Sequence, residues 1–218
     1  MRRVWWSRVA AAGLLAVGAA GCGGAAGSHS VTTGRAAPAT TAASPKLRGL
    51  VPEPLPRKPS FTLTDTAGRP FHFAAATRGK LTYLYFGYTH CPDACPATMG
   101  NLAYALRLQP ASVRKQVEVV FVTVDPRRDT RRVLRAWLDH FNAAFVGLTG
   151  TARQIVAAER AAGVPLAPPT RHSGKNYAVE HSSLVFPYSP DDSAHVVYTQ
   201  GFRAADYAHD MPILAGYS

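Results

Sequence analysis

Two runs of apolar and β-branched residues most constrain how this 218-residue chain can fold. Residues 81–86 read Leu-Thr-Tyr-Leu-Tyr-Phe, and residues 117–124 read Val-Glu-Val-Val-Phe-Val-Thr-Val. Runs of this length and composition are typical of strands that are buried on both faces. A segment with helical spacing follows each run, so the pattern predicts an α/β domain with a largely parallel sheet.

The other segments extend this pattern. Residues 61–73 alternate around a turn at Gly68 and predict an N-terminal hairpin. Helices are expected over residues 96–108, 130–141, 151–163 and 207–214, the last of them weakened by Pro212. Further strands are expected over residues 145–148, 180–186 and 195–199, of which the last two would form a closing hairpin. This order resembles a thioredoxin-like fold, with a central mixed sheet flanked by helices.

The amino terminus has the pattern of an export signal. Three arginines precede residues 9–20, an uncharged apolar run of 12 residues. A helix that spans a membrane needs about 20 residues, so this run is too short. Cys22 follows Gly21 and resembles the acylated cysteine of bacterial lipoproteins, although alanine replaces the usual leucine three residues before it.

We therefore expect a lipoprotein-type signal peptide over residues 1–21 and lipidation of Cys22. The lipid would anchor the protein at the outer face of the bacterial cytoplasmic membrane. An ordinary cleaved signal with an incidental cysteine is the alternative.

Composition separates a tether from a domain. Residues 22–57 are rich in Ala, Gly, Ser, Thr and Pro and predict a flexible tether ahead of a domain over residues 58–218. The formal net charge of +11 first suggests a nucleic-acid partner. Without the signal peptide, 21 basic and 13 acidic residues remain, and no aromatic residues are interleaved with the arginines. We therefore expect no nucleic-acid partner. The basic side chains are expected to be solvated or to contact anionic lipid headgroups.

Two cysteines, four residues apart, follow the first buried run. If Cys95 lies in the first turn of the next helix, this spacing puts its sulfur on the same side as that of Cys91. The positive end of the helix dipole favours thiolate there and lowers the thiol pKa. A separation of one turn also permits a disulfide between them. The pair therefore supports two chemistries, reversible oxidation and binding of a soft cation such as Cu(I).

A metal site with two thiolates needs another ligand, and the chain has eight histidines. For any one of them, a surface or hydrogen-bonded structural role is the alternative. His90 adjoins Cys91, but neighbouring residues on a turn tend to point apart. His181 begins the expected strand 180–186, and in a thioredoxin-like sheet the residue that enters this strand faces the cysteine turn. Thioredoxins have a proline at this position, and this chain does not. Because of its position opposite the cysteine turn, His181 is the candidate third ligand.

Four ordered motifs resemble the Sco/SenC family of copper-binding, thioredoxin-like proteins that assist cytochrome c oxidase assembly. They cover residues 87–96, 121–130, 147–151 and 180–183, and the similarity extends over residues 61–214. The resemblance implies one copper ion per domain, Cu(I) or Cu(II), held by Cys91, Cys95 and His181. Cu(I) would suit these three ligands, and Cu(II) would recruit one more.

The resemblance also implies partners. In the family, copper passes to the dinuclear copper centre of the oxidase, and in some members the cysteines reduce the thiols of that centre. The expected partner of this chain is a copper-accepting oxidase subunit or another copper chaperone, and we expect a monomer.

Three acidic residues lie near the predicted site. Asp125 is assigned to the turn after strand 117–124, and Asp129 or Thr130 to the cap of the next helix. An alternative role for Asp125 and Asp129 is to orient the cysteine loop. Asp93 lies within that loop and would hold its backbone rather than bind the metal.

One stretch departs from the family pattern. Residues 186–192 read Phe-Pro-Tyr-Ser-Pro-Asp-Asp, where members usually end an apolar run with Asp-Pro-Asp-Gly or a close variant. Because Pro187 lacks an N–H donor, we expect this strand to lie at a sheet edge or to end early.

Three functions remain open from these residues. A metallochaperone is favoured over an enzyme. The alternatives are an extracytoplasmic thiol–disulfide oxidoreductase that uses Cys91 and Cys95 without metal, and a redox or copper sensor. The four-residue spacing, the missing proline and His181 argue against a general oxidoreductase.

Overall fold

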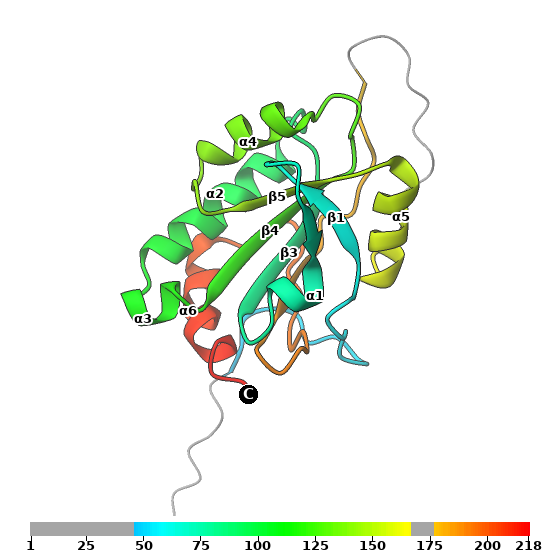
Figure 1. The fold of residues 1–218 in the computed structure, drawn as a ribbon. Helices are drawn as coiled ribbons and strands as arrows, with labels where there is room; N and C mark the ends of the chain where they lie inside the picture. Colours follow the sequence, from blue (N-terminus) through cyan, green and yellow to red (C-terminus); the bar gives the residue numbers. More distant parts are fainter. Residues whose placement is uncertain (1–45, 167–176) are drawn as a thin grey trace, which may run out of the picture. The chain divides into compact units, whose positions relative to one another are not determined.

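The computed structural model describes residues 46–166 and 177–218 (Figure 1). Its six strands are β1 (Thr62–Asp65), β2 (Pro70–His72), β3 (Leu81–Gly87), β4 (Val117–Thr123), β5 (Val146–Thr149) and β6 (Val185–Tyr188). Its helices are α1 (Phe73–Ala76), α2 (Ala94–Arg107), α3 (Ala111–Arg114), α4 (Arg131–Asp139), α5 (Ala152–Ala161) and α6 (Ala204–Leu214). None of these helices is long and apolar enough to cross a membrane.

The six strands form one mixed sheet in the order β2-β1-β5-β4-β3-β6. Strands β3, β4 and β5 run parallel, whereas β1, β2 and β6 pair with their neighbours in antiparallel fashion. The predicted α/β class, the mixed sheet and the N-terminal hairpin β1–β2 are therefore confirmed.

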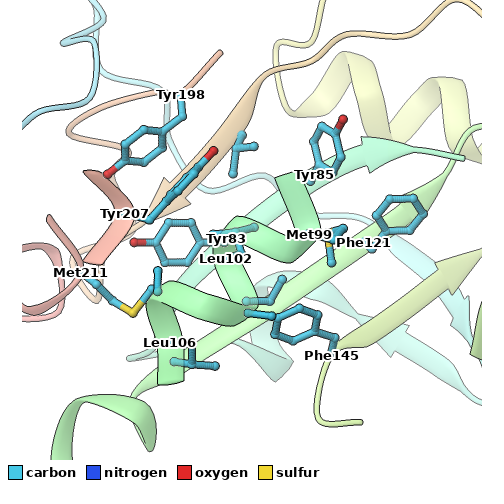
Figure 2. Packing of buried hydrophobic residues seen from close by; sticks show 14 of the residues in the cluster. Tyr83, Tyr85, Met99, Leu102, Leu106, Phe121, Phe145, Tyr198, Tyr207 and Met211 are labelled. Carbon is cyan, nitrogen blue, oxygen red and sulfur yellow. The ribbon is translucent and has the colours of Figure 1, made fainter. Parts of the chain in front are cut away.

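Strand β3 is buried along its whole length, as its composition predicts. On one face, Tyr83 and Tyr85 pack in a cluster to which α2, α4 and α6 contribute (Figure 2). On the other face, Leu84 and Phe86 pack in a cluster to which α1 and α5 contribute. The two helical layers remove both faces of β3 from water, and apolar burial of this kind is the main stabilising contribution to a domain.

Local signals fix where the helices begin. The Thr130 side chain caps α4 by accepting a hydrogen bond from the Val133 N–H, and Thr151 forms a capping box with Gln154 at the start of α5. Helices α1 and α3 are single turns of four residues each, too short to leave a periodic pattern in the sequence.

Helix α6 continues through Pro212 and begins earlier than predicted, at Ala204. A proline inside a helix removes one N–H and leaves the carbonyl four residues earlier without its helical donor, here that of Ala208. The Gln109 side-chain amide supplies the missing donor, because its Nε2 lies 2.9 Å from that carbonyl oxygen. This contact explains how the helix tolerates Pro212.

The closing hairpin differs from the prediction. Strand β6 begins only at Val185, and residues 194–198 join it through isolated bridges rather than a continuous strand. The Val185 N–H donates to the Tyr198 carbonyl, so the main-chain N–H and C=O groups of Val185 point away from β3. In an antiparallel pair the same holds two residues later, at Pro187. The missing donor of Pro187 thus falls on the outer side. Strand β6 ends the sheet order, which confirms the predicted edge position.

The domain also begins earlier than the predicted boundary at residue 58. The main-chain N–H groups of Arg48 and Gly49 donate to the buried Asp210 carboxylate, at distances of 2.9–3.0 Å. Leu50 then pairs with Val197. Residues 46–57 therefore belong to the domain. The predicted signal peptide, Cys22 and the rest of the predicted tether lie outside the described residues.

Candidate metal centre

The two cysteines lie where β3 passes into α2. Cys91 belongs to the connecting loop, where its N–H donates to the Tyr88 carbonyl. Cys95 lies in the first turn of α2, as predicted, and its N–H points at the Cys91 sulfur at 3.4 Å. The first N–H groups of a helix have no partner within the helix, and here the Cys91 sulfur takes up one of them.

Helix α2 approaches the sheet closely at this point. A Cβ atom at Gly87, the last residue of β3, would lie 2.6 Å from the Cys95 sulfur and 3.0 Å from the Phe121 ring. Such a contact is too short for any side chain, so the glycine permits the Cys95 sulfur to sit against the end of the strand.

The structure brings His181 to the cysteines. The two sulfurs and one imidazole nitrogen all lie within 4.8 Å of one another, and His181 Nε2 is 3.5 Å from the Cys95 sulfur. The Nδ1 atom lies 2.9 Å from the Ser182 carbonyl oxygen. Because a carbonyl only accepts, Nδ1 carries the proton and Nε2 turns its lone pair toward the sulfurs. The three residues that the sequence singled out therefore converge with their donor atoms facing inward.

The site is closed on one side and open on the other. Cys95 is fully buried, whereas Cys91 and His181 are partly exposed. A hollow of about 560 Å³ borders the open side, and its walls include Val179, Glu180 and Gln200. His181 also lines this hollow, so an incoming group can reach the site past His181.

Two tyrosines flank the three residues. The Tyr85 hydroxyl lies 3.5 Å from the Cys95 sulfur. The rings of Tyr85 and Tyr88 meet the His181 ring edge-on, with centroids 6.3 and 5.3 Å away. Nothing in the sequence marks either tyrosine as part of the site, because each looks like an ordinary aromatic core residue.

Burial changes the acidity of the inner cysteine. It raises the pKa of Cys95 to about 12, and the hydrogen bond from Tyr85 opposes this rise only in part. The expectation that the helix terminus lowers the thiol pKa is therefore wrong for Cys95. In the metal-free site, burial of the Cys95 sulfur raises its pKa by more than the helix dipole lowers it.

The acidic residues hold the loops around the site. Asp129 is fully buried and accepts hydrogen bonds from the Thr89 N–H at 2.9 Å, the Thr89 hydroxyl at 2.5 Å and the Thr123 hydroxyl at 2.6 Å. It thereby ties the cysteine loop to the end of β4. Asp129 and Thr130 are the two predicted caps of α4, and the structure shows that Thr130 is the cap.

The other two carboxylates have different surroundings. Asp125 is buried and accepts hydrogen bonds from the Arg128 Nε and, at 2.8 Å, from the Tyr177 hydroxyl. Asp93 is exposed and makes no capping hydrogen bond with its side chain, while its carbonyl accepts from Ala97 at the start of α2. Within the described residues, none of the three carboxylates joins the cysteines and His181.

Comparison with known proteins places the chain in a family. The family model described as SCO1/SenC matches residues 52–215. A Stutzerimonas stutzeri protein named for copper binding is 37% identical over 142 residues, which are 64% of this chain and 69% of that protein. The mitochondrial SCO2 homolog of Bos taurus is 36% identical over 151 residues, which are 69% of this chain and 56% of the homolog.

A solved structure agrees with this assignment. Copper-bound ScoI of Arabidopsis thaliana is 28% identical and superposes with a TM-score of 0.63, covering 72% of this chain and 98% of the ScoI chain. The fold, the order of the motifs and the family model all lead to one assignment. This chain belongs to the SCO1/SenC family and has its thioredoxin-like fold.

Proposed function

We propose that this protein is an exported, membrane-anchored copper chaperone. It would bind one copper ion through Cys91, Cys95 and His181 and deliver it to the dinuclear copper site of cytochrome c oxidase. The observation that carries the proposal is the convergence of two sulfurs and one imidazole nitrogen within 4.8 Å at a half-open site. Family membership supports copper as the cargo and the oxidase as the client.

The donor set fits copper. Thiolate and imidazole are soft or borderline ligands, which suit Cu(I), whereas Mg²⁺ and Ca²⁺ require oxygen ligands. Three donors match the low coordination number of Cu(I) and leave a side open to a further ligand. Because Cys91 and His181 are partly exposed, a ligand of the client can enter there while buried Cys95 still holds the ion.

Export and lipidation complete the proposal. The predicted signal peptide over residues 1–21 and the predicted acylation of Cys22 support a location at the outer face of the bacterial cytoplasmic membrane. The lipid would keep the domain close to a membrane-bound client.

Thiol reduction of the client is the second candidate function, and the unequal exposure of the cysteines favours it. The Cys91 thiolate would attack a client disulfide to form a mixed disulfide, and one client thiolate would leave. Cys95 would then attack the Cys91 sulfur, release the second client thiol and leave a Cys91–Cys95 disulfide. The raised pKa of Cys95 opposes this second step, so we rank copper delivery first.

A Cu(I) titration of the reduced mature chain tests the proposal. The chain carries Cys22→Ser, so that its remaining thiols are Cys91 and Cys95. We expect one Cu(I) per chain in competition with a chromophoric Cu(I) chelator, and at least a tenfold weaker affinity in His181→Ala. His72→Ala is the matched control, because His72 lies on the edge strand β2 and bonds only to Thr62 among the contacts described. Wild-type affinity in His181→Ala, or no copper retained by the parent chain, would refute the proposal.

A further inference from the structure

The Cys95 sulfur has a hydroxyl group directly beside it. Tyr85 lies in β3, is fully buried, and places its hydroxyl oxygen 3.5 Å from that sulfur. The close approach of α2 at Gly87 brings the sulfur within reach of the tyrosine. The contact therefore joins two elements whose positions are fixed by the core (Figure 2).

The direction of this hydrogen bond follows from the chemistry of the groups. A thiolate can only accept, and a tyrosine hydroxyl can donate, so Tyr85 is the donor once Cys95 is ionised. The Tyr88 main-chain N–H is a further donor to the same sulfur. His181 also lies 3.5 Å from it, but its proton is on Nδ1, so its Nε2 does not donate. Of the side chains around this sulfur, Tyr85 is thus the donor.

A donor to a metal-binding thiolate affects the two oxidation states of copper unequally. The hydrogen bond withdraws electron density from the sulfur and weakens its donation to the metal. Cu(II) depends more on that donation than Cu(I) does, so hydrogen bonds around a cysteine ligand change the balance between the two states. A buried donor acts most strongly, since no water competes with it.

We propose that Tyr85 is a positioning residue that favours Cu(I) over Cu(II) in this site by donating a hydrogen bond to the Cys95 thiolate. The inference rests on the proposed copper-binding function and adds to it a residue outside the three ligands. The Tyr85 ring also meets the His181 ring edge-on, so the same side chain contacts two of the three donors.

The chain supplies a matched control on the same strand. Tyr83 lies two residues before Tyr85, on the same face of β3, and is also fully buried. Its ring packs against Tyr198 and Tyr207, at the far side of the cluster from Tyr85 (Figure 2). Tyr83→Phe and Tyr85→Phe each remove one buried hydroxyl from one strand, but only the second removes a contact to the site.

The test compares the parent chain carrying Cys22→Ser with these two variants. Cu(I) and Cu(II) dissociation constants are measured anaerobically by competition with chelators, and the sulfur-to-copper charge-transfer band of the Cu(II) form is recorded. In Tyr85→Phe we expect the ratio of the two constants to shift toward Cu(II) by roughly tenfold and the band to move to lower energy. In Tyr83→Phe we expect both to match the parent.

The outcomes separate this inference from the proposed function. If all three chains bind one copper ion and Tyr85→Phe matches Tyr83→Phe in both measurements, the inference is wrong and the proposed function stands. If the parent binds no copper, the proposed function itself fails.

A second variant covers the case in which Tyr85→Phe does not fold. Tyr85→3-fluorotyrosine keeps the hydroxyl and makes it a stronger donor, so the ratio must then shift toward Cu(I). No shift, or a shift toward Cu(II), would overturn the inference.

Discussion

The Arg128 guanidinium lies over the Tyr177 ring, 3.6 Å from its centroid, and both side chains donate to the buried Asp125 carboxylate. Arg128 also lies 5.7 Å from the centroid of the Tyr88 ring, which in turn contacts His181. Residues 177–184 form no helix or strand. The Arg128–Tyr177 contact thus holds the segment that carries His181 beside the cysteine loop.

Removal of this contact should weaken Cu(I) binding without changing a ligand. We expect Tyr177→Ala to raise the Cu(I) dissociation constant roughly tenfold, because it loses a cation–π contact and a hydrogen bond. Tyr177→Phe keeps the ring over Arg128 and should show a smaller loss. Competition titration of both variants checks this, and equal affinity in Tyr177→Ala and the parent chain would contradict it.

Asp129 should contribute to the stability of the domain through the cysteine loop. In Asp129→Asn, an amide replaces one of the acceptor oxygens that Thr89 and Thr123 use, and a buried donor is left facing them. We expect a loss of about 1–3 kcal/mol in the free energy of unfolding, measured with urea. Asp139→Asn is the control, since its half-exposed side chain pairs with Arg135 at the surface. An equal effect in both variants would show that burial of Asp129 does not matter.

The two cysteines should differ in reactivity toward iodoacetamide. In the reduced, metal-free chain at pH 8, Cys91 should be alkylated first, because Cys95 is fully buried and its pKa is raised to about 12. Peptide mass spectrometry follows each site over time, and unfolding in urea should equalise the rates. Equal rates in the folded chain would contradict the raised pKa.

The same shift predicts how stability varies with pH. A thiol whose pKa is higher in the folded than in the unfolded chain holds its proton more tightly when folded. Its contribution is complete below the ordinary thiol pKa of 9.0 and is lost as the pH rises toward 12. The metal-free domain should therefore lose stability over this range, and Cys95→Ser should show a smaller loss.

Gln109 and Pro212 should be energetically coupled. Gln109→Ala leaves the Ala208 carbonyl without its side-chain donor, and we expect the free energy of unfolding to fall by about 1–3 kcal/mol. In a chain that also carries Pro212→Ala, the main-chain N–H of residue 212 can bond to that carbonyl. Gln109→Ala should therefore lower the free energy of unfolding by less in that chain. Urea unfolding of the four chains of the double-mutant cycle measures the difference, and additive effects would rule out the coupling.

The part of this fold that sequence predicts well has strong local signals. Strands β3 and β4 are seven residues long and largely apolar or aromatic, and Thr130 and Thr151 mark the starts of α4 and α5. The cysteine turn and the expected strand 180–186 predict His181 as the third donor, and His181 reaches the sulfurs although β6 begins only at Val185. Signals of this kind depend mainly on neighbours in sequence.

The parts that sequence missed depend on contacts between distant residues. Arg128 and Tyr177 are 49 positions apart, and no periodicity relates them. The raised pKa of Cys95 results from burial by the whole core, which outweighs the local helix terminus. Residues 46–57 resemble a tether in composition, yet the buried carboxylate of Asp210 accepts hydrogen bonds from the main-chain N–H groups of Arg48 and Gly49.

That carboxylate also sets how far the chain can be shortened. A chain that starts at residue 46 keeps both main-chain donors to Asp210, whereas one that starts at Leu50 leaves the buried carboxylate with the Tyr198 hydroxyl and His209 alone. If Cys22 carries the lipid that we propose, insertions and deletions upstream of residue 46 would change the distance between lipid and domain without altering this contact. The point at which the chain enters the domain is fixed by the two main-chain hydrogen bonds to Asp210, whatever precedes it.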